Sequence, residues 1–228
     1  MKYLRDHGYP LRFLTNTTMR SRLELVEKLR AFGIHAEREE MFSTSVVATH
    51  WLREQGISRI HLLVPRAVQE DFADFDITDD HPDAVVVGDL GSEFSFEVLN
   101  HAFRLIRDGA RLIALQKNRF WQRADGLALD VGPFVVALEY ATEREASVIG
   151  KPTAAYFKMA LHDLELPANQ VAMVGDDIHN DIAGGQAVGL RTILVKTGKY
   201  QFDDVAKVDC QADWTLDSIA DLPALLGP

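Results

Sequence analysis

Short runs of β-branched and other apolar residues alternate along this chain with longer segments in which apolar residues recur at helical spacing. Such alternation is typical of a parallel sheet covered by helices. The pattern therefore predicts an α/β fold with a doubly wound, Rossmann-like parallel sheet. The predicted strands are Leu11–Thr15, Arg59–Val64, Ala84–Gly88, Arg111–Leu115, Ser147–Gly150, Val171–Gly175 and Arg191–Val195.

Two helices are marked by their ends. Ser21 and Glu24 have the spacing of a capping box, and Gly33 and Gly109 stand where helices would end. The apolar faces between these signals consist of Leu25, Leu29 and Phe32 in the first helix, and of Phe96, Leu99, Phe103 and Ile106 in the second. Residues 1–8 are predicted to be the last turns of a helix, and the Asp-rich segment Gln69–Pro82 an exposed loop.

Composition narrows the classes of function. With 228 residues, 47% of them hydrophobic, the chain can form one large domain or a core that carries an inserted module. A formal charge of -10 disfavours nucleic acid and anionic membranes as partners. Cys210 is the single cysteine, and the N-terminus begins with charged residues rather than an apolar signal region. The single cysteine and this N-terminus lead us to expect a cytoplasmic protein. No apolar run is long enough to span a bilayer.

An acidic turn follows the predicted strand Val171–Gly175. Asp176 and Asp177 stand at the carboxyl end of the strand, where open α/β sheets bind their ligands, and Asp181 follows one helical turn later. Clustered carboxylates repel one another unless a cation lies between them, and Mg²⁺ prefers such hard oxygen ligands. The alternative is a helix N-terminus at which Asp177 is the cap and Asp181 is solvated. The segment alone favours neither.

Two further strand ends carry polar groups. Lys151 follows the predicted strand Ser147–Gly150, and Pro152 fits the first turn of the next helix. A lysine placed there can hold a phosphoryl group, although an isolated lysine is more often a surface residue. Thr15 and Asn16 end the first predicted strand and can donate hydrogen bonds to phosphoryl oxygens, but such residues are also common in turns.

The ordered set of these segments resembles the haloacid dehalogenase (HAD) superfamily of hydrolases. The resemblance is to its subclass IIA, which carries a C2-type cap and includes the phospholysine phosphohistidine inorganic pyrophosphate phosphatases. It rests on five segments: Phe13-Leu-Thr-Asn, the stretch that begins Asp130-Val-Gly-Pro-Phe, Val148-Ile-Gly-Lys-Pro, Val174-Gly-Asp-Asp-Ile and Leu194-Val-Lys-Thr-Gly-Lys-Tyr.

The resemblance implies a Mg²⁺-dependent phosphatase that acts on a small phosphorylated compound through an aspartyl-phosphate intermediate. Thr15 and Asn16 would bind the phosphoryl group, and Lys151 would neutralise it and act in catalysis. Asp176 and Asp177 would serve the metal, and Asp181 would support it and take part in catalysis.

The resemblance also implies a division into domains. Residues 1–41 and 131–228 would form the HAD core, and residues 42–130 an inserted α/β cap that selects the substrate and can take part in homodimer contacts. Lys117, Asn118 and Arg119 would contact the substrate from the cap, with a simple polar turn as the alternative.

One family motif is absent. Family members carry Asp-x-(Asp/Ser)-Gly on a strand ahead of the Thr-Asn strand, and residues 1–10 do not contain it. Loss of that strand would leave unpaired edges beside the strands of Thr15 and Asp176. Either the natural protein begins upstream, which we expect, or these two strands pair directly.

Two other classes of function compete with a phosphatase. The first is a non-catalytic protein that binds a phosphorylated ligand or a metal. The second, a nucleotide-binding protein, is disfavoured because no glycine-rich phosphate-binding motif follows a predicted strand. The eight histidines show no zinc spacing and are expected to be surface or packing residues, with His179 alone near the acidic turn.

Overall fold

The computed structural model describes residues 1–205 and 207–227. The chain forms two compact units. The first unit comprises Met1–Arg12 and Lys151–Pro228, and the second comprises Phe13–Gly150. The predicted cap boundaries at residues 42 and 130 lie inside the second unit and stay a prediction.

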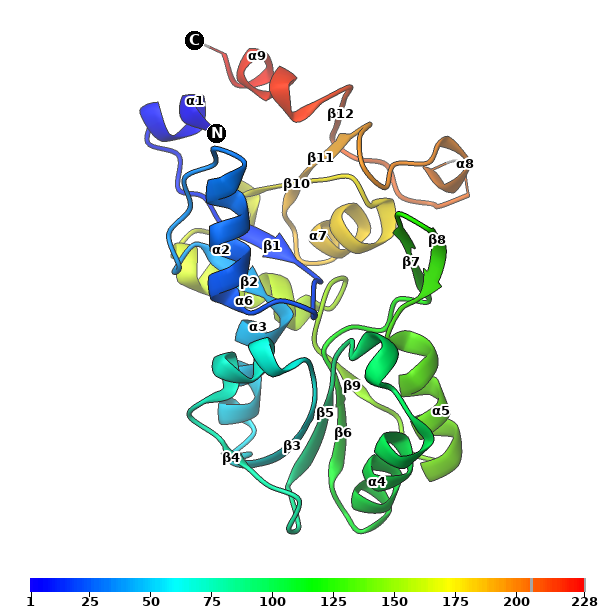
Figure 1. The fold of residues 1–228 in the computed structure, drawn as a ribbon. Coiled ribbons are helices and arrows are strands. Elements are labelled where there is room, and N and C mark those ends of the chain that lie inside the picture. Colours follow the sequence, from blue (N-terminus) through cyan, green and yellow to red (C-terminus); the bar gives the residue numbers. More distant parts are fainter. Residues whose placement is uncertain (206, 228) are drawn as a thin grey trace. The chain divides into compact units, whose positions relative to one another are not determined.

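The first unit contains a parallel three-stranded sheet in the order β10-β11-β12, with β10 at Ala172–Gly175, β11 at Arg191–Val195 and β12 at Trp214–Leu216 (Figure 1). Neighbouring residues of β11 point to opposite faces of the sheet. Ile193 packs with Leu4 and Leu222 on one side, and Leu194 packs with Ile178 and Ile182 on the other. Both faces of this sheet are therefore covered.

Apart from the 11-residue α6, the helices of the first unit are short. They are α1 (Lys2–Asp6), α6 (Ala154–Leu164), α7 (Gly184–Gln186), α8 (Phe202–Val205) and α9 (Leu222–Leu226), with the 3-10 turns η3 (Ala168–Gln170) and η5 (Ile219–Asp221) and the π-helical turn η4 (Ile178–Ala183).

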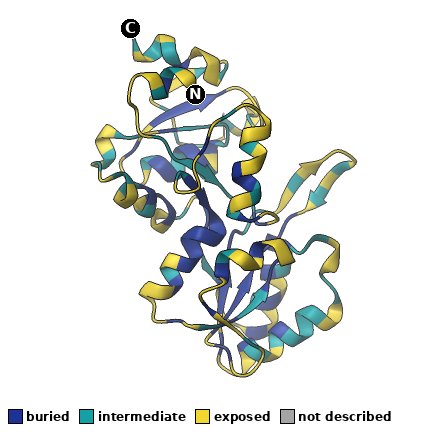
Figure 2. Ribbon diagram, turned by 60° about the vertical axis from the view of Figure 1, so that its left-hand side comes forward, coloured by how far each residue is buried: buried dark blue, intermediate teal, exposed yellow. Residues whose placement is uncertain are grey.

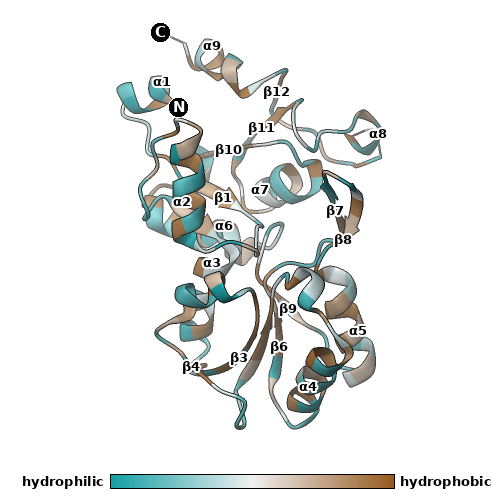
Figure 3. Ribbon diagram, viewed as in Figure 1, coloured by the Kyte–Doolittle hydropathy of each residue, from teal (hydrophilic) through white to brown (hydrophobic). Residues whose placement is uncertain are grey.

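The second unit is built on a parallel five-stranded sheet in the order β4-β3-β5-β6-β9. The strands are β3 (Arg59–Leu63), β4 (Asp76–Ile77), β5 (Ala84–Val87), β6 (Arg111–Ala114) and β9 (Ser147–Val148). Every residue of the central strand β5 is fully buried, because helices cover both faces. Figure 2 shows this sheet largely as buried residues, and Figure 3 shows apolar colours along β3 and β6.

Four helices surround that sheet and its neighbours: α2 (Arg22–Ala31), α3 (Thr44–Glu54), α4 (Phe96–Arg107) and α5 (Gly132–Thr142). Figure 1 shows α4 and α5 on one face of the five-stranded sheet and α3 on the other. The remaining elements are the 3-10 turns η1 (Arg66–Phe72) and η2 (Gly91–Glu93), the parallel pair β1 (Phe13–Thr15) and β2 (Met41–Ser43), and the hairpin of β7 (Phe120–Arg123) and β8 (Gly126–Leu129). No helix among residues 1–205 and 207–227 is long and apolar enough to cross a membrane.

The predicted parallel α/β fold is confirmed, with a strand inside each of the seven predicted ranges. The predicted capping box is confirmed as well. The Ser21 hydroxyl accepts the backbone N–H of Glu24, and the Glu24 carboxylate accepts the N–H of Ser21. Two residues of the predicted apolar faces are exposed: Phe32, the C-cap of the first helix, is 70% exposed, and Phe96 of the second is 76% exposed.

The predicted loop Gln69–Pro82 is partly wrong. Its first part belongs to η1, in which Phe72 is fully buried, and residues 76–77 form β4. β4 pairs with β3 in parallel, with Ile60 opposite Ile77. Phe72 and Phe75 anchor this stretch in the interior, whereas most of its aspartates are exposed. The many polar residues therefore led to the wrong prediction of a loop.

β1, which carries Thr15, pairs with β2 inside the second unit, and β10, which precedes Asp176, pairs with β11 inside the first unit. Direct pairing of β1 with β10, one of the two outcomes considered from the sequence, stays a prediction.

Candidate functional site

The acidic turn of the first unit begins where β10 ends. Gly175 is the last residue of the strand, Asp176 and Asp177 follow it, and η4 begins at Ile178. The carboxyl end of β10 thus presents acidic side chains, as the sequence predicts. The buried residues Met173 and Ile178 anchor the chain on the two sides of the turn.

Asp181 forms a buried ion pair with Lys151. The Lys151 Nζ atom lies 2.6 Å from Asp181 Oδ1, and the two side chains are only 9% and 6% exposed. The second carboxylate oxygen, Oδ2, accepts the backbone N–H of Asp177 at 3.2 Å. The alternative that Asp181 is merely solvated is wrong, and Lys151 is not an ordinary surface lysine.

Gly175 makes room for this pair. A Cβ atom at position 175 would overlap Oδ2 and Cβ of Asp181 and would lie 2.5 Å from its Cγ. Because real Cβ atoms do not approach other atoms so closely, the contact requires glycine at the end of β10. The strand end, the turn and the Lys151–Asp181 pair therefore form one tightly packed arrangement.

Asp177 caps the helical segment that follows it. Its Oδ1 accepts the backbone N–H groups of His179 at 3.1 Å and of Asn180 at 2.9 Å, and its Oδ2 accepts the Asn180 side-chain amide at 2.8 Å. Burial raises the pKa of Asp177, but the hydrogen bonds from Asn180 and the charge of Lys199 outweigh it, and the pKa lies below the ordinary value of 3.8. The capping role left open by the sequence is confirmed, and a metal-binding role for Asp177 stays a prediction.

Replacing Asp177 with alanine should lower the free energy of unfolding by about 1 kcal/mol at neutral pH, the usual contribution of a helix cap. Because the pKa of Asp177 is lowered in the folded chain, its ionised form contributes stability above pH 3.8, and this contribution is lost as the pH falls through the lower folded value. The difference between wild type and Asp177→Ala should therefore shrink below pH 3.8.

Urea unfolding on both sides of that pH measures this difference. Asp177→Asn is the matched control, because asparagine also caps helices but does not titrate. A gap between wild type and Asp177→Ala that stays constant with pH would contradict the assignment.

Asp176 is oriented by the loop that contains Gly198 and Lys199, a contact that was not predicted from the sequence. Its Oδ2 accepts the backbone N–H of Lys199 at 2.7 Å, and a Cβ at Gly198 would overlap this carboxylate. Gly198 has a φ of +58°, a conformation that glycine adopts readily. Oδ1 of Asp176 accepts no hydrogen bond from the described residues and remains available as a hard oxygen ligand. In the sequence, Gly198, three residues after the end of β11 at Val195, was the signal that could have indicated this loop.

Thr15 and Asn16 lie at the carboxyl end of β1 in the second unit. The Thr15 Oγ1 atom accepts the backbone N–H of Thr17 at 3.1 Å. Asn16 Oδ1 lies 2.8 Å from the position that a Cβ of Gly150 would occupy, so glycine permits this close approach. Gly150 directly precedes Lys151 in the chain. That Thr15 and Asn16 share a site with Lys151 and Asp176 stays a prediction.

Three further predictions from the sequence concern Lys117, Pro152 and the histidines. Lys117 forms an ion pair with Glu139 of α5, at 2.7 Å from Oε2, and this pairing favours a structural role over a substrate contact. The placement of Pro152 in the first turn of a helix is wrong, because Thr153 is the N-cap and α6 begins at Ala154. The expectation that the histidines are surface or packing residues stays a prediction, although His61 and His101 lie together with Asp79.

Comparison with known proteins gives consistent matches. Residues 1–78 match the family described as haloacid dehalogenase-like hydrolase, and residues 148–222 match the family described as HAD-hydrolase-like. The haloacid dehalogenase-like hydrolase domain-containing protein 2 of Homo sapiens is 44% identical over 209 residues, which cover 92% of this chain and 80% of that protein. The phospholysine phosphohistidine inorganic pyrophosphate phosphatase of Homo sapiens is 38% identical over 218 residues, with 95% and 80% covered. The p-nitrophenyl phosphatase from Archaeoglobus fulgidus has a similar structure, with a TM-score of 0.91, 30% identity, and 97% and 88% of the two chains covered.

Proposed function

Because the chain belongs to the haloacid dehalogenase-like hydrolase family, we propose that it is a Mg²⁺-dependent phosphatase of small phosphorylated compounds. The observation that carries the proposal is the buried Lys151–Asp181 pair beside the acidic turn at the carboxyl end of β10. This is the end of a parallel sheet at which α/β proteins bind their ligands. The phosphatases among the chain's relatives support the reaction class.

The donor set at the acidic turn fits Mg²⁺. Asp176 offers a carboxylate oxygen that accepts no hydrogen bond from the described residues, and hard oxygen atoms are the ligands that Mg²⁺ prefers. We assign Asp176 as the direct ligand. Asp177 and Asp181 would accept hydrogen bonds from the metal's water molecules, since their carboxylates already cap η4 and pair with Lys151. When bound, Mg²⁺ would supply electrostatic stabilisation of the phosphoryl charge.

Lys151 would neutralise the phosphoryl group. An ammonium group in a buried setting interacts more strongly with an anion than the same group in water. Asp181 acts through Lys151, because its Oδ1 holds the ammonium at 2.6 Å and its Oδ2 is fixed by the N–H of Asp177. Thr15 and Asn16 would donate hydrogen bonds to the phosphoryl oxygens without adding charge.

The family reaction is a two-step displacement. A carboxylate attacks phosphorus, the alcohol of the ester leaves, and water then hydrolyses the aspartyl-phosphate to release phosphate. The printed sequence contains no Asp-x-(Asp/Ser)-Gly motif in residues 1–10, so the attacking carboxylate has no counterpart there. The inserted cap predicted at residues 42–130 would select the substrate.

Hydrolysis of p-nitrophenyl phosphate tests the proposal in the 228-residue chain and in a form extended at its N-terminus by a strand with Asp-x-Asp-Gly. The extended form should turn over with Mg²⁺ and stop when the metal is chelated. Asp176→Ala should lower its activity by more than about 100-fold, because groups that only support a metal ligand already contribute about 10- to 100-fold.

Asp217→Ala is the matched control, since this exposed aspartate pairs with Lys196 and is not one of the residues assigned to the site. Absence of turnover in the extended form would contradict the proposal. Binding of Mg²⁺ and phosphate by calorimetry without turnover in either form would instead support the alternative of a protein that binds phosphorylated ligands.

A further inference from the structure

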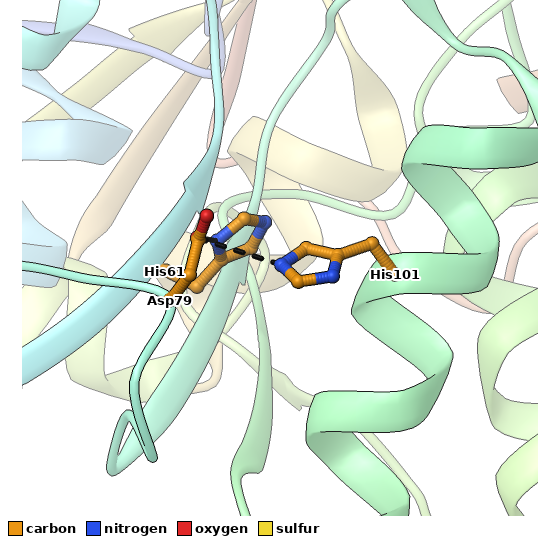
Figure 4. Close-up of side chains that lie close together, drawn as sticks. All are labelled: His61, Asp79 and His101. Carbon is orange, nitrogen blue, oxygen red and sulfur yellow. Dashed lines mark hydrogen bonds and ion pairs between the residues drawn. The ribbon is translucent and has the colours of Figure 1, made fainter.

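Three potential metal ligands meet in the second unit, and none of them is a residue assigned to phosphate chemistry. They are His61 of β3, Asp79 in the loop after β4, and His101 of α4 (Figure 4). His61 Nδ1 lies 2.6 Å from Asp79 Oδ1, and His101 Nε2 lies 3.5 Å from the same oxygen. One ligand atom from each residue lies within 4.8 Å of the others.

The fold accounts for this meeting of residues far apart in the sequence. β4 pairs with β3 in parallel, and the N–H of Thr78 continues the ladder by donating to the carbonyl of Ile60 at 2.9 Å. Asp79 therefore emerges next to His61. The rings of His61 and His101 meet edge to face, with their centroids 5.0 Å apart. Two of the three side chains are thus held by regular secondary structure, and the third lies on a loop that starts at a paired strand.

One ring nitrogen in this group lacks a hydrogen bond. His101 Nε2 is buried and has no hydrogen-bond partner among the described residues, although the outer part of the residue is exposed. Buried polar atoms without partners are rare in folded proteins, and each calls for an explanation such as a bound ion.

We propose that His61, Asp79 and His101 form a site for a divalent transition-metal ion of the zinc class. Two imidazole nitrogens and one carboxylate oxygen are typical zinc ligands, whereas Mg²⁺ prefers oxygen alone. Three protein ligands leave the fourth tetrahedral position to water or another small ligand.

The distances are close to those that a metal requires. Ligand atoms about 2.1 Å from a tetrahedral zinc ion lie about 3.4 Å from one another. The 3.5 Å between His101 Nε2 and Asp79 Oδ1 already has this value. The hydrogen bond between His61 and Asp79 has to open by less than about 1 Å to admit the ion. The ligand atoms that lie farthest apart, within 4.8 Å of one another, have to approach by up to about 1.4 Å. The Asp79 side chain is 71% exposed, so it can move outward and the ion can enter from solvent.

Neighbouring charged groups have other partners. His81 lies two residues after Asp79, but its Nδ1 pairs with Asp108 at 3.0 Å. Asp80 lies close to Arg59, 3.4 Å from Nη2. The proposed site therefore consists of three residues. An ion bound there would tie the loop after β4 to α4 and would stabilise the second unit by binding only its folded form.

Calorimetric titration of the metal-free 228-residue protein with ZnCl₂ tests the proposal. Wild type should bind one equivalent at this site, and His101→Ala and Asp79→Asn should each weaken that binding at least about tenfold, because each removes a ligand. His50→Ala is the matched control, an exposed histidine of α3 in the same unit, and should leave the binding unchanged. Replacing Zn²⁺ with Co²⁺ should give a visible absorption spectrum that changes in the two ligand variants only.

Two results would overturn the proposal. The first is wild-type protein that binds no Zn²⁺, and the second is equal affinity in wild type, His101→Ala and Asp79→Asn. His101 and Asp79 are 43% and 71% exposed, so both variants should fold, and their circular dichroism spectra check this. Asp176→Ala should retain the zinc site, so that failure of the phosphatase proposal and failure of this proposal are separate outcomes.

Discussion

Replacing Lys151 with methionine should lower the free energy of unfolding by about 3–5 kcal/mol, because it leaves the carboxylate of Asp181 buried without its counter-charge. Both side chains of this pair are less than a tenth exposed, so water cannot compensate for the lost partner. Methionine has nearly the length of lysine and keeps most of the packing. The expected loss therefore reports the unpaired charge rather than a cavity.

Denaturant unfolding measures this effect, and two further variants make it specific. Lys151→Met combined with Asp181→Leu should recover much of the lost stability, since it removes both buried charges. Lys196→Met breaks an ion pair of similar length, 2.8 Å, whose side chains are 45% and 84% exposed, and should leave the stability nearly unchanged. A similar loss of unfolding free energy in Lys151→Met and Lys196→Met would show that burial does not determine how much the Lys151–Asp181 pair contributes to stability.

Gly175→Ala should destabilise the chain by about 1–3 kcal/mol, the usual effect of inserting a methyl group into a closely packed site. The added methyl group would overlap Asp181 at its Cβ, an atom near the backbone that cannot turn away. Relief of the overlap requires movement of η4 or β10, and either movement pulls the carboxylate away from Lys151. The variant should therefore also weaken phosphatase activity in the extended form.

Gly185→Ala is the matched control for this substitution. It adds the same methyl group within the same unit, where the nearest atom, Met173 Cβ, is 3.2 Å away. Its effect on the free energy of unfolding should be within about 1 kcal/mol, since alanine favours the helix and offsets the contact. Equal destabilisation by both substitutions, measured by thermal unfolding, would contradict a special requirement at position 175.

The sequence predicted correctly those helices and strands that are marked by local signals, such as a continuous apolar run or a helix cap. The continuous apolar run of β5 and the capping box before α2 are local signals, and both predictions are confirmed. The segment Gln69–Pro82 was predicted wrongly because its two buried phenylalanines are embedded among aspartates. Pairing of β4 with β3 stabilises that segment, and a partner strand is not a local property of a sequence.

In the candidate site, too, the local contacts were predicted from the sequence and the contacts between distant residues were not. The acidic residues after β10 share one turn, and their spacing predicted that they would cluster. The partner of Asp181 is 30 residues away, and the loop that orients Asp176 is more than 20 residues away, so only the tertiary structure shows these contacts. The histidine cluster had no signal at all, because its members are separated by 18 and 22 residues on three different elements.

The position of β10 in its sheet has a consequence for the acidic turn. Inside the first unit β10 lies at the end of the strand order β10-β11-β12. A segment that paired with β10 in parallel on the side opposite β11 would bring its own C-terminal residues next to Asp176. Whatever side chain that segment carries at this point would share the environment of Asp176, whether it comes from the same molecule or from a separate peptide.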